Sequence, residues 1–298
     1  MNQQSYIEAM GKRFGLTNAK PKNIPMDPGL QLSDAQCPST AEEKKRMAHV
    51  PYAQAIGSVL WPTIVLRPDA AYAVGILAQF VQNPGHAHWE ALKRVITYLM
   101  MTKNLWLTFG GKHNTGIQGY CDADWASQKH QHSISGYSFH LGQGAITWSS
   151  KKQNIVALSS TETEYVGQNH AAREALWLHN YVSEFTDQKD HMYLWSRGSG
   201  GIPVNPRDQR GSHDQPIIIN MDNQGAIALS KDNKFHARTK HIDIRYHFVR
   251  AAVQSQKLSF KYIPGTENPA DIFTKALPKA TFVKFTKKLG LHALEGEC

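Results

Sequence analysis

Hydrophobic side chains recur with a helical period through much of the first third of the chain. Between Val50 and Met101 they return every three or four positions, which places them on one face of a helix. We predict three helices here: one through Tyr52 and Ile64, one after Pro68, and one over His88–Leu99.

The segments on either side of these helices have weaker patterns. Tyr6–Phe14 fits one short amphipathic helix, and Pro21–Pro38 has the Pro, Asp and Gly content of an extended connector. Leu105–Phe109 fits a short strand, and the pair Gly110-Gly111 follows it as a boundary. We therefore predict a mostly helical first part, residues 1–111, and a second part, residues 112–298.

After Gly111 the period of the hydrophobic positions becomes shorter. Gly116–Cys121, Gly136–Leu141 and Ala145–Ser149 are short β-rich runs joined by tight turns, and they predict an antiparallel meander. Two further runs, Pro216–Asn220 and Leu258–Ile263, predict two more strands.

Helical stretches separate and follow these strands. They are expected from Ser159 to about Phe185, over Gln224–Leu229 and Ile242–Val253, after Asn268-Pro269, and over Lys279–Leu289. Thr186–Gln215 is dense in Asp, Gly, Arg, Ser and Pro, which predicts a mobile surface insertion. The alternation of strands and helices is typical of an α/β fold.

Four acidic residues stand at the boundaries of the predicted elements. Asp122 and Asp222 each end a strand, Glu164 lies near the start of a helix, and Asp271 lies in the first turn of another. Ligands of open α/β sheets bind at the carboxyl ends of strands. Mg²⁺ prefers oxygen ligands, and two such ions can activate water and stabilise a leaving oxygen. We predict that the four acids converge on a divalent metal site for phosphodiester hydrolysis.

Two glutamates compete for the helical position in that set. At about 100° per residue, Glu164 shares a stripe with Ala171 and Ala175, small enough to face a sheet. Glu162 lies roughly 200° away from Glu164. Ser159 and Glu162 also have the spacing of a capping box, which gives Glu162 a structural role. We therefore predict Glu164 as the ligand.

Composition and charge narrow the class of protein. At 298 residues, with 41% hydrophobic content, the chain can bury a sizeable core. Its three cysteines have no paired spacing, so we expect neither a disulfide framework nor a cysteine zinc site. We expect no membrane-spanning segment and, since the N-terminus lacks a basic-then-apolar leader, an intracellular protein.

Most of the positive charge lies in the last part of the chain. The net charge is +9, and residues 231–298 hold thirteen Lys and Arg against six Asp and Glu. A basic region of this kind indicates a polyanion partner, of which nucleic acid is the usual one. The alternative is a solvated basic surface with no partner.

With these motifs in order, the chain resembles the copia-type LTR-retrotransposon Pol polyproteins over nearly its whole length. The first half of the family's ribonuclease H domain is matched by Tyr120–Ala126, Ser135–Tyr137, Ala145–Gln153 and Ala157–Tyr165. The second half is matched by Asp222–Ile227, Arg238–Phe248 and Asn268–Leu277. Tyr52–Gly111 resembles the thumb and connection at the end of the family's reverse transcriptase.

This resemblance implies a fold, a site and an activity. The fold is ribonuclease H-like: a mixed five-stranded sheet with flanking helices, preceded by the mostly helical reverse-transcriptase tail. The family's metal-binding set falls on Asp122, Glu164, Asp222 and Asp271, with two Mg²⁺ ions that Mn²⁺ can replace. The implied activity is cleavage of the RNA strand of an RNA–DNA hybrid, with the rest of a reverse transcriptase as a further partner.

Parts of the family pattern are missing. The Tyr-x-Asp-Asp motif of the polymerase is absent from the sequence, so we do not expect this chain to copy nucleic acid. Many ribonucleases H carry a histidine in the loop before the last acid, but Pro264–Asn268 contains none. The segment Thr186–Gln215 is longer than the family usually shows.

Several basic and amide side chains near these motifs are candidate contacts to a nucleic-acid backbone. They are Lys151, Lys152, Gln153, Asn223, Gln224, Arg238, Lys240 and His241. Two other functions fit clustered acids: an inert module that only binds nucleic acid, and a transposase- or integrase-like nuclease. Nucleases of that second class typically present three acids, so Asp271 as a fourth favours ribonuclease H.

Overall fold

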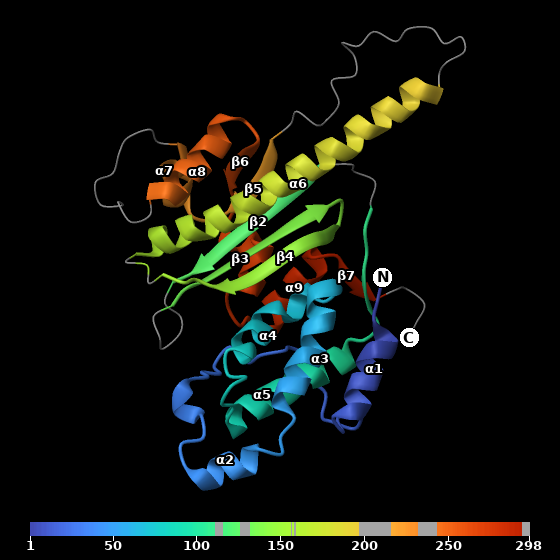
Figure 1. Cartoon of the computed structure of the whole chain (residues 1–298), viewed down its shortest axis with the longest axis vertical. Helices are drawn as coiled ribbons and strands as arrows, with labels where there is room; N and C mark the ends of the chain where they lie inside the picture. Colours follow the sequence, from blue (N-terminus) through green and yellow to red (C-terminus); the bar gives the residue numbers. More distant parts are fainter. Residues whose placement is uncertain are drawn as a thin grey trace.

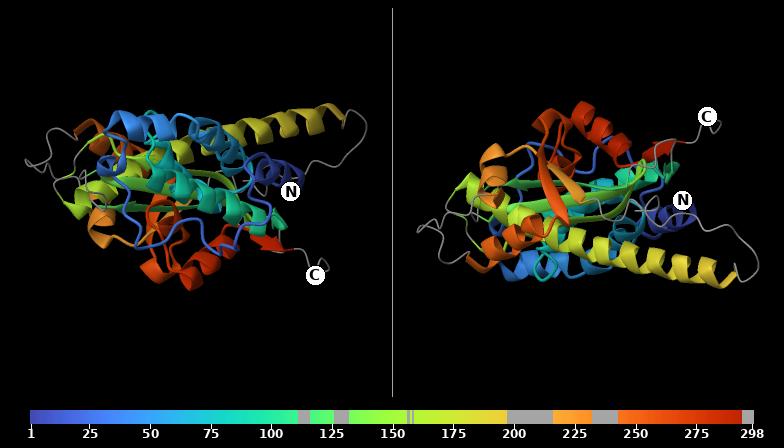
Figure 2. Two further views of the ribbon diagram at one scale, coloured as in Figure 1. Left: turned by 90° about the horizontal axis from the view of Figure 1, so that it is seen from below. Right: turned by 90° about the horizontal axis from the view of Figure 1, so that it is seen from above.

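Two groups of helices cover opposite faces of one five-stranded sheet in a computed structural model of the chain (Figure 1). The structure describes residues 1–110, 116–125, 132–155, 157, 159–196, 216–231 and 243–293. Both views of Figure 2 place α6 (Ser160–Ser196, yellow) and α9 (Lys279–Lys288, red) on opposite sides of the sheet.

The sheet is mixed, with the strand order β4-β3-β2-β5-β6. Its strands are β2 (Ile117–Asp124), β3 (Ile134–Leu141), β4 (Gly144–Lys152), β5 (Ile217–Met221) and β6 (Leu258–Tyr262). The first three form the predicted antiparallel meander, whereas β5 and β6 run parallel to β2. This arrangement confirms the predicted ribonuclease H-like fold.

One face of the sheet is covered by α6 together with α7 (Gln224–Lys231) and α8 (Asp243–Gln254). Cys121, Phe139 and Ile219 point from the strands into this core, where Ala171 and Ala175 of α6 meet them. The small side chains of α6 thus face the sheet, as the helical stripe predicts.

The other face is covered by the N-terminal helices and by α9. The N-terminal helices are α1 (Gln4–Arg13), α2 (Ala41–Met47), α3 (Tyr52–Val65), α4 (Ala71–Ala78) and α5 (His86–Met101). Leu92 and Val95 of α5 belong to the same buried cluster as Phe273 and Phe285, from the C-terminal end of the chain. This buried cluster contains residues from before and after position 111, and the domain boundary at that position stays a prediction.

A small second sheet also joins distant segments. It consists of β1 (Leu105–Leu107) and β7 (Leu291–Ala293), which pair antiparallel. The pattern predicts a strand at 105–109, but a two-stranded pairing is not readable from either segment alone.

Two predicted helices differ from the structure. The helix expected to end near Phe185 continues to Ser196, so the first residues of the predicted insertion are helical. The rest of that insertion lies outside the described residues. The helix expected after Asn268 is a short 3-10 helix, η6 (Pro269–Phe273), which Asn268 caps by accepting a hydrogen bond from the Ala270 backbone N–H at 3.2 Å.

None of the helices in the described ranges combines the length and the hydropathy that crossing a membrane requires.

Candidate active site

Two neighbouring strands bring two of the predicted acids to one edge of the sheet. β2 and β5 are parallel and adjacent, with Tyr120 paired to Asn220. Asp122 lies two residues beyond the first of these positions, and Asp222 two residues beyond the second. Because parallel strands end at the same edge, both carboxylates arrive at the same place.

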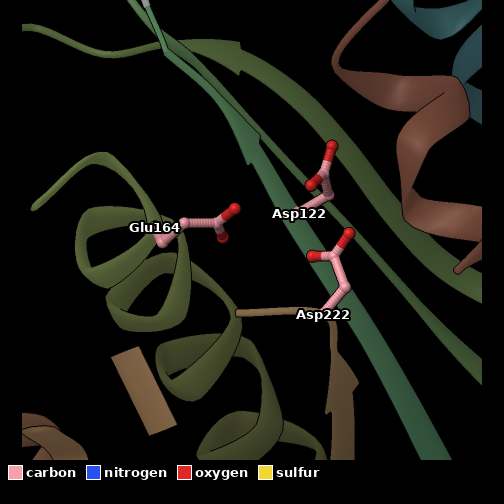
Figure 3. Close-up of side chains that lie close together, drawn as sticks. All are labelled: Asp122, Glu164 and Asp222. Carbon is pink, nitrogen blue, oxygen red and sulfur yellow. The ribbon is translucent and has the colours of Figure 1, made fainter. Parts of the chain in front are cut away.

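The helix α6 supplies the third carboxylate from across this edge. A Cβ at Gly167 would lie only 3.0 Å from the Ala123 Cβ, so the glycine lets the start of α6 approach β2 closely. Glu164, 8% exposed, then points at the strand ends (Figure 3). One carboxylate oxygen from each of Asp122, Glu164 and Asp222 lies within 4.8 Å of the other two.

The fourth predicted acid, Asp271, lies beside this group rather than within it. Asn268 fixes the start of η6 by donating its side-chain amide to the Cys121 carbonyl at 3.0 Å. The Thr274 hydroxyl at the end of η6 donates to Asp122 Oδ2. Lys275 connects the two acids, because its Nζ lies 3.0 Å from Asp271 Oδ2 and 3.9 Å from Asp122 Oδ2.

A glycine on β3 makes room for η6. Gly136 is paired with Asp122 across the strands, and a Cβ on it would lie 2.6 Å from the Phe273 Cβ. Without that close approach the Thr274 hydroxyl would not reach Asp122. The resemblance includes Ser135-Gly136-Tyr137, but the reason for the glycine is visible only in the packing.

Burial and mutual repulsion raise the pKa values of the carboxyl groups in the acidic group. Burial, with Asp122 and Asp222 nearby, raises the pKa of Glu164 to about 10. Burial and Asp122 likewise raise the pKa of Asp222, and they raise that of Asp271 to about 7. Burial alone would lower the pKa of Lys275, but Asp122 and Asp271 raise it. In a site where the ionised carboxylates are disfavoured in this way, a bound cation would stabilise them.

Two buried oxygen atoms lack the partners that such atoms normally have. Glu164 Oε2 and Asp271 Oδ1 make no hydrogen bond within the described part of the chain. Buried carboxylate oxygens are rarely left unpartnered. Oxygen-only ligands with free lone pairs are the donor set that Mg²⁺ and Mn²⁺ prefer, so these residues fit a divalent ion.

The candidate nucleic-acid contacts lie in several environments. Lys151 and Gln224 are exposed, whereas the Lys152 Nζ donates to Gln79 Oε1 at 3.2 Å. Asn223 accepts a hydrogen bond from the Ala226 backbone N–H at 2.9 Å and so caps α7. Arg238, Lys240 and His241 lie outside the described residues.

Gln153, also a candidate contact, is buried and bonded to other parts of the protein. It is 1% exposed, and its amide donates to Ser135 Oγ at 2.8 Å and to the Thr163 carbonyl at 3.0 Å. It therefore links β3 to the first turn of α6 and offers no exposed surface to a phosphate.

Sequence reasoning overlooked two residues that the structure places at the site, Thr274 and Lys275. Both contact Asp122, which is more than 150 residues earlier in the chain. The available signal was their place in Asn268–Leu277, a segment that the resemblance includes as a whole.

The chain is similar to known retrotransposon proteins over almost its full length. It is 39% identical over 294 residues to the retrovirus-related Pol polyprotein from transposon TNT 1-94 of Nicotiana tabacum, covering 98% of this chain and 20% of that protein. It is 33% identical over 292 residues to the Pol polyprotein from transposon RE1 of Arabidopsis thaliana, covering 98% of this chain and 18% of that one. The chain thus spans about a fifth of the length of these curated relatives.

The chain was also compared with solved structures and with protein-family models. RNase H1 from the archaeon Halobacterium salinarum is 14% identical with a TM-score of 0.33, over 53% of this chain and 93% of that structure. No protein-family model matches the chain. Over 98% of its length, the chain is therefore similar to one part of the Pol polyproteins of plant retrotransposons.

Proposed function

We propose that this chain is a metal-dependent endonuclease that hydrolyses the RNA strand of RNA–DNA hybrids. The observation that carries the proposal is the group Asp122, Glu164 and Asp222, whose oxygens come from three separate elements and lie within 4.8 Å of one another. The similarity to the Pol polyproteins and the ribonuclease H-like sheet support the same activity.

The carboxylates have distinct positions for this chemistry. Asp122 and Asp222 lie at the centre and can hold two Mg²⁺ ions, with Glu164 as a further ligand on one side and Asp271 on the other. Bound there, divalent ions would activate a water for in-line attack and stabilise the leaving oxygen. The products are a 3′-hydroxyl and a 5′-phosphate. Mn²⁺ can substitute because it accepts the same oxygen ligands.

Substrate selection would rest on the shape and sugar chemistry of the hybrid. The 2′-hydroxyl groups across the minor groove distinguish the RNA strand from DNA. The candidate backbone contacts in the described ranges are Lys151, Lys152, Asn223 and Gln224, and Arg238, Lys240 and His241 remain candidates from the sequence. In a Pol polyprotein the further partner is the rest of the reverse transcriptase.

Cleavage of three labelled duplexes tests this proposal. We expect the protein to cut only the RNA of an RNA–DNA hybrid, in Mg²⁺ or Mn²⁺ but not with a chelator, and Asp122→Asn to abolish cutting. Binding of the hybrid without cleavage would instead support an inert nucleic-acid-binding remnant. Cleavage of double-stranded DNA would support a transposase-like nuclease, and double-stranded RNA serves as the control for strand specificity.

A further inference from the structure

The ammonium group of Lys275 lies between two of the acids of the site. Its Nζ is 3.0 Å from Asp271 Oδ2 and 3.9 Å from Asp122 Oδ2, and its side chain is 40% exposed. Asp271 lies within η6 and Lys275 lies two residues beyond its end, so the two side chains are four positions apart and meet on one side of this segment.

These contacts engage one oxygen of each acid on the Asp271 side of the site. Asp122 Oδ2 faces Lys275 and also accepts the hydroxyl of Thr274. Of the two carboxylates, that of Asp271 lies nearer to the ammonium, through Oδ2. An ion placed between Asp122 and Asp271 would therefore have to displace Lys275.

The other side of the site has no such cation among the residues that the structure describes. Among the described residues, Asp122, Glu164 and Asp222 form the group whose oxygens approach within 4.8 Å, and Glu164 Oε2 there has no hydrogen-bond partner. One divalent ion can bind here without disturbing Lys275.

Formal charge also favours one divalent ion on the Glu164 side and the ammonium on the Asp271 side. When all four are ionised, the carboxylates carry four negative charges, and one divalent ion together with one ammonium offsets three of them. A second divalent ion beside the ammonium would leave a buried excess of positive charge, which is costly without a further anion.

We propose that Lys275 is the built-in cation of the Asp271 side, so that the free protein takes up a single divalent ion, at Asp122, Glu164 and Asp222. This inference rests on the proposed metal-dependent function. Lys275 is then a positioning residue: it holds Asp271 toward Asp122 until a second ion takes its place.

Counting bound Mn²⁺ tests this inference without any reference to cleavage. The loss of the free Mn²⁺ signal in electron paramagnetic resonance, during titration of the full chain, gives the number of ions bound. We expect one ion for the wild type and two for Lys275→Met, because the neutral side chain frees the Asp271 side. Lys275→Arg keeps the charge and should bind one ion.

Two further variants control for folding and for general loss of charge. Lys279→Met removes an exposed lysine of α9 and should leave one ion bound. Lys275→Gln repeats the neutralisation with a polar side chain, and thermal melts in chelator show which variants are folded.

The outcomes separate this inference from the proposed function. Two ions on the wild type, or one ion on both folded neutral variants, overturns the inference about Lys275 and leaves the proposed function standing. Failure of every protein to bind Mn²⁺ overturns both. The expected counts without cleavage of the hybrid would uphold Lys275 as the built-in cation and reject the nuclease activity.

Discussion

Two buried charged clusters in this molecule are built in opposite ways. In the helical region, Arg67 and Asp69 are 2% and 1% exposed and meet in two hydrogen bonds of 3.0 and 2.8 Å. Tyr98 donates its hydroxyl to the same carboxylate, and Arg67 also reaches the Thr102 carbonyl at 3.0 Å. At the sheet edge, by contrast, the ammonium of Lys275 contacts two of the four acids, Asp122 and Asp271, and no other cation of the described residues pairs with the group.

The difference separates a structural cluster from a binding site. Arg67 and Asp69 carry opposite charges and satisfy each other, so nothing from outside is needed to complete them. Within the described part of the chain, the acidic cluster has more acids than cations, and two of its buried oxygens have no hydrogen-bond partner. Buried charge that the protein itself does not neutralise indicates a ligand, here a divalent cation.

The largest expected effect comes from breaking the paired cluster. Asp69→Ala leaves the buried Arg67 guanidinium without its partner, and we expect a loss of about 3–5 kcal/mol in the free energy of unfolding. Urea denaturation measures this loss. Asp27→Ala removes the exposed ion pair with Arg94 instead and should cost below about 1 kcal/mol. Equal losses for the two variants would mean that the buried pair is not the structural centre of the helical region.

The buried imidazole of His140 gives the free energy of unfolding a pH dependence opposite in sign to that of the acidic cluster. Burial lowers the pKa of His140 to about 4, from 6.5 when the chain is unfolded. The neutral ring therefore contributes stability that is complete above pH 6.5 and is lost as the pH falls through 4. The total loss is about 3 kcal/mol, since each pKa unit is worth about 1.4 kcal/mol.

Denaturation curves of wild type and His140→Gln at pH 7 and pH 4 isolate this contribution. We expect the acid-induced loss of stability to be smaller in the variant by that amount. The acidic cluster works in the other direction, because protonation relieves its repulsion. An unchanged pH dependence in the variant would assign the acid sensitivity to other groups.

The sequence predicted the elements better than the contacts between them. Local periodicity placed the strand that carries Asp122 and the strand that leads into Asp222, because alternation and turn residues are properties of short segments. It could not place Thr274 and Lys275 beside Asp122, since that contact depends on how η6 packs over Gly136. Arg67 and Asp69 are neighbours in the sequence, but the contact of Tyr98 with Asp69 likewise arises only when α5 packs against them.

The limits of periodicity are also visible in the lengths of helices. α6 continues past Phe185 to Ser196 although the polar composition after Phe185 predicted a surface insertion. The cap at Asn268 was predicted correctly, but the segment that it starts is a 3-10 helix of five residues. A capping residue determines where a helical segment begins and leaves its length to tertiary packing.

Neutralising one acid should separate stability from metal binding. Glu164→Gln replaces a buried carboxylate near two others by a neutral side chain of the same shape. We expect it to stabilise the metal-free protein by about 1–2 kcal/mol, because folding no longer has to bury a carboxylate or bind the proton that neutralises it. Thermal melts in chelator measure the gain, and added Mn²⁺ should raise the melting temperature of the variant less than that of the wild type.

Glu162→Gln is the matched control, two positions away on the same helix and outside the acidic group. Its response to Mn²⁺ should equal that of the wild type. If Glu164→Gln lowers stability in chelator, the acidic cluster is held together by contacts of the kind seen at Arg67.

The smallest expected effect tests whether Asp222 belongs to the metal-binding part of the acidic cluster. A Cβ at Gly265 would lie 2.7 Å from Asp222 Oδ2, so Gly265→Ala must displace that carboxylate. We expect a roughly tenfold weaker affinity for Mn²⁺, as for other disturbances next to a metal ligand, with little change in the melting temperature in chelator. Thr266→Ala changes the neighbouring exposed side chain and should bind Mn²⁺ like the wild type. Equal affinity of Gly265→Ala and wild type would show that Asp222 tolerates displacement, and would remove it from the set of ligands that hold the ion.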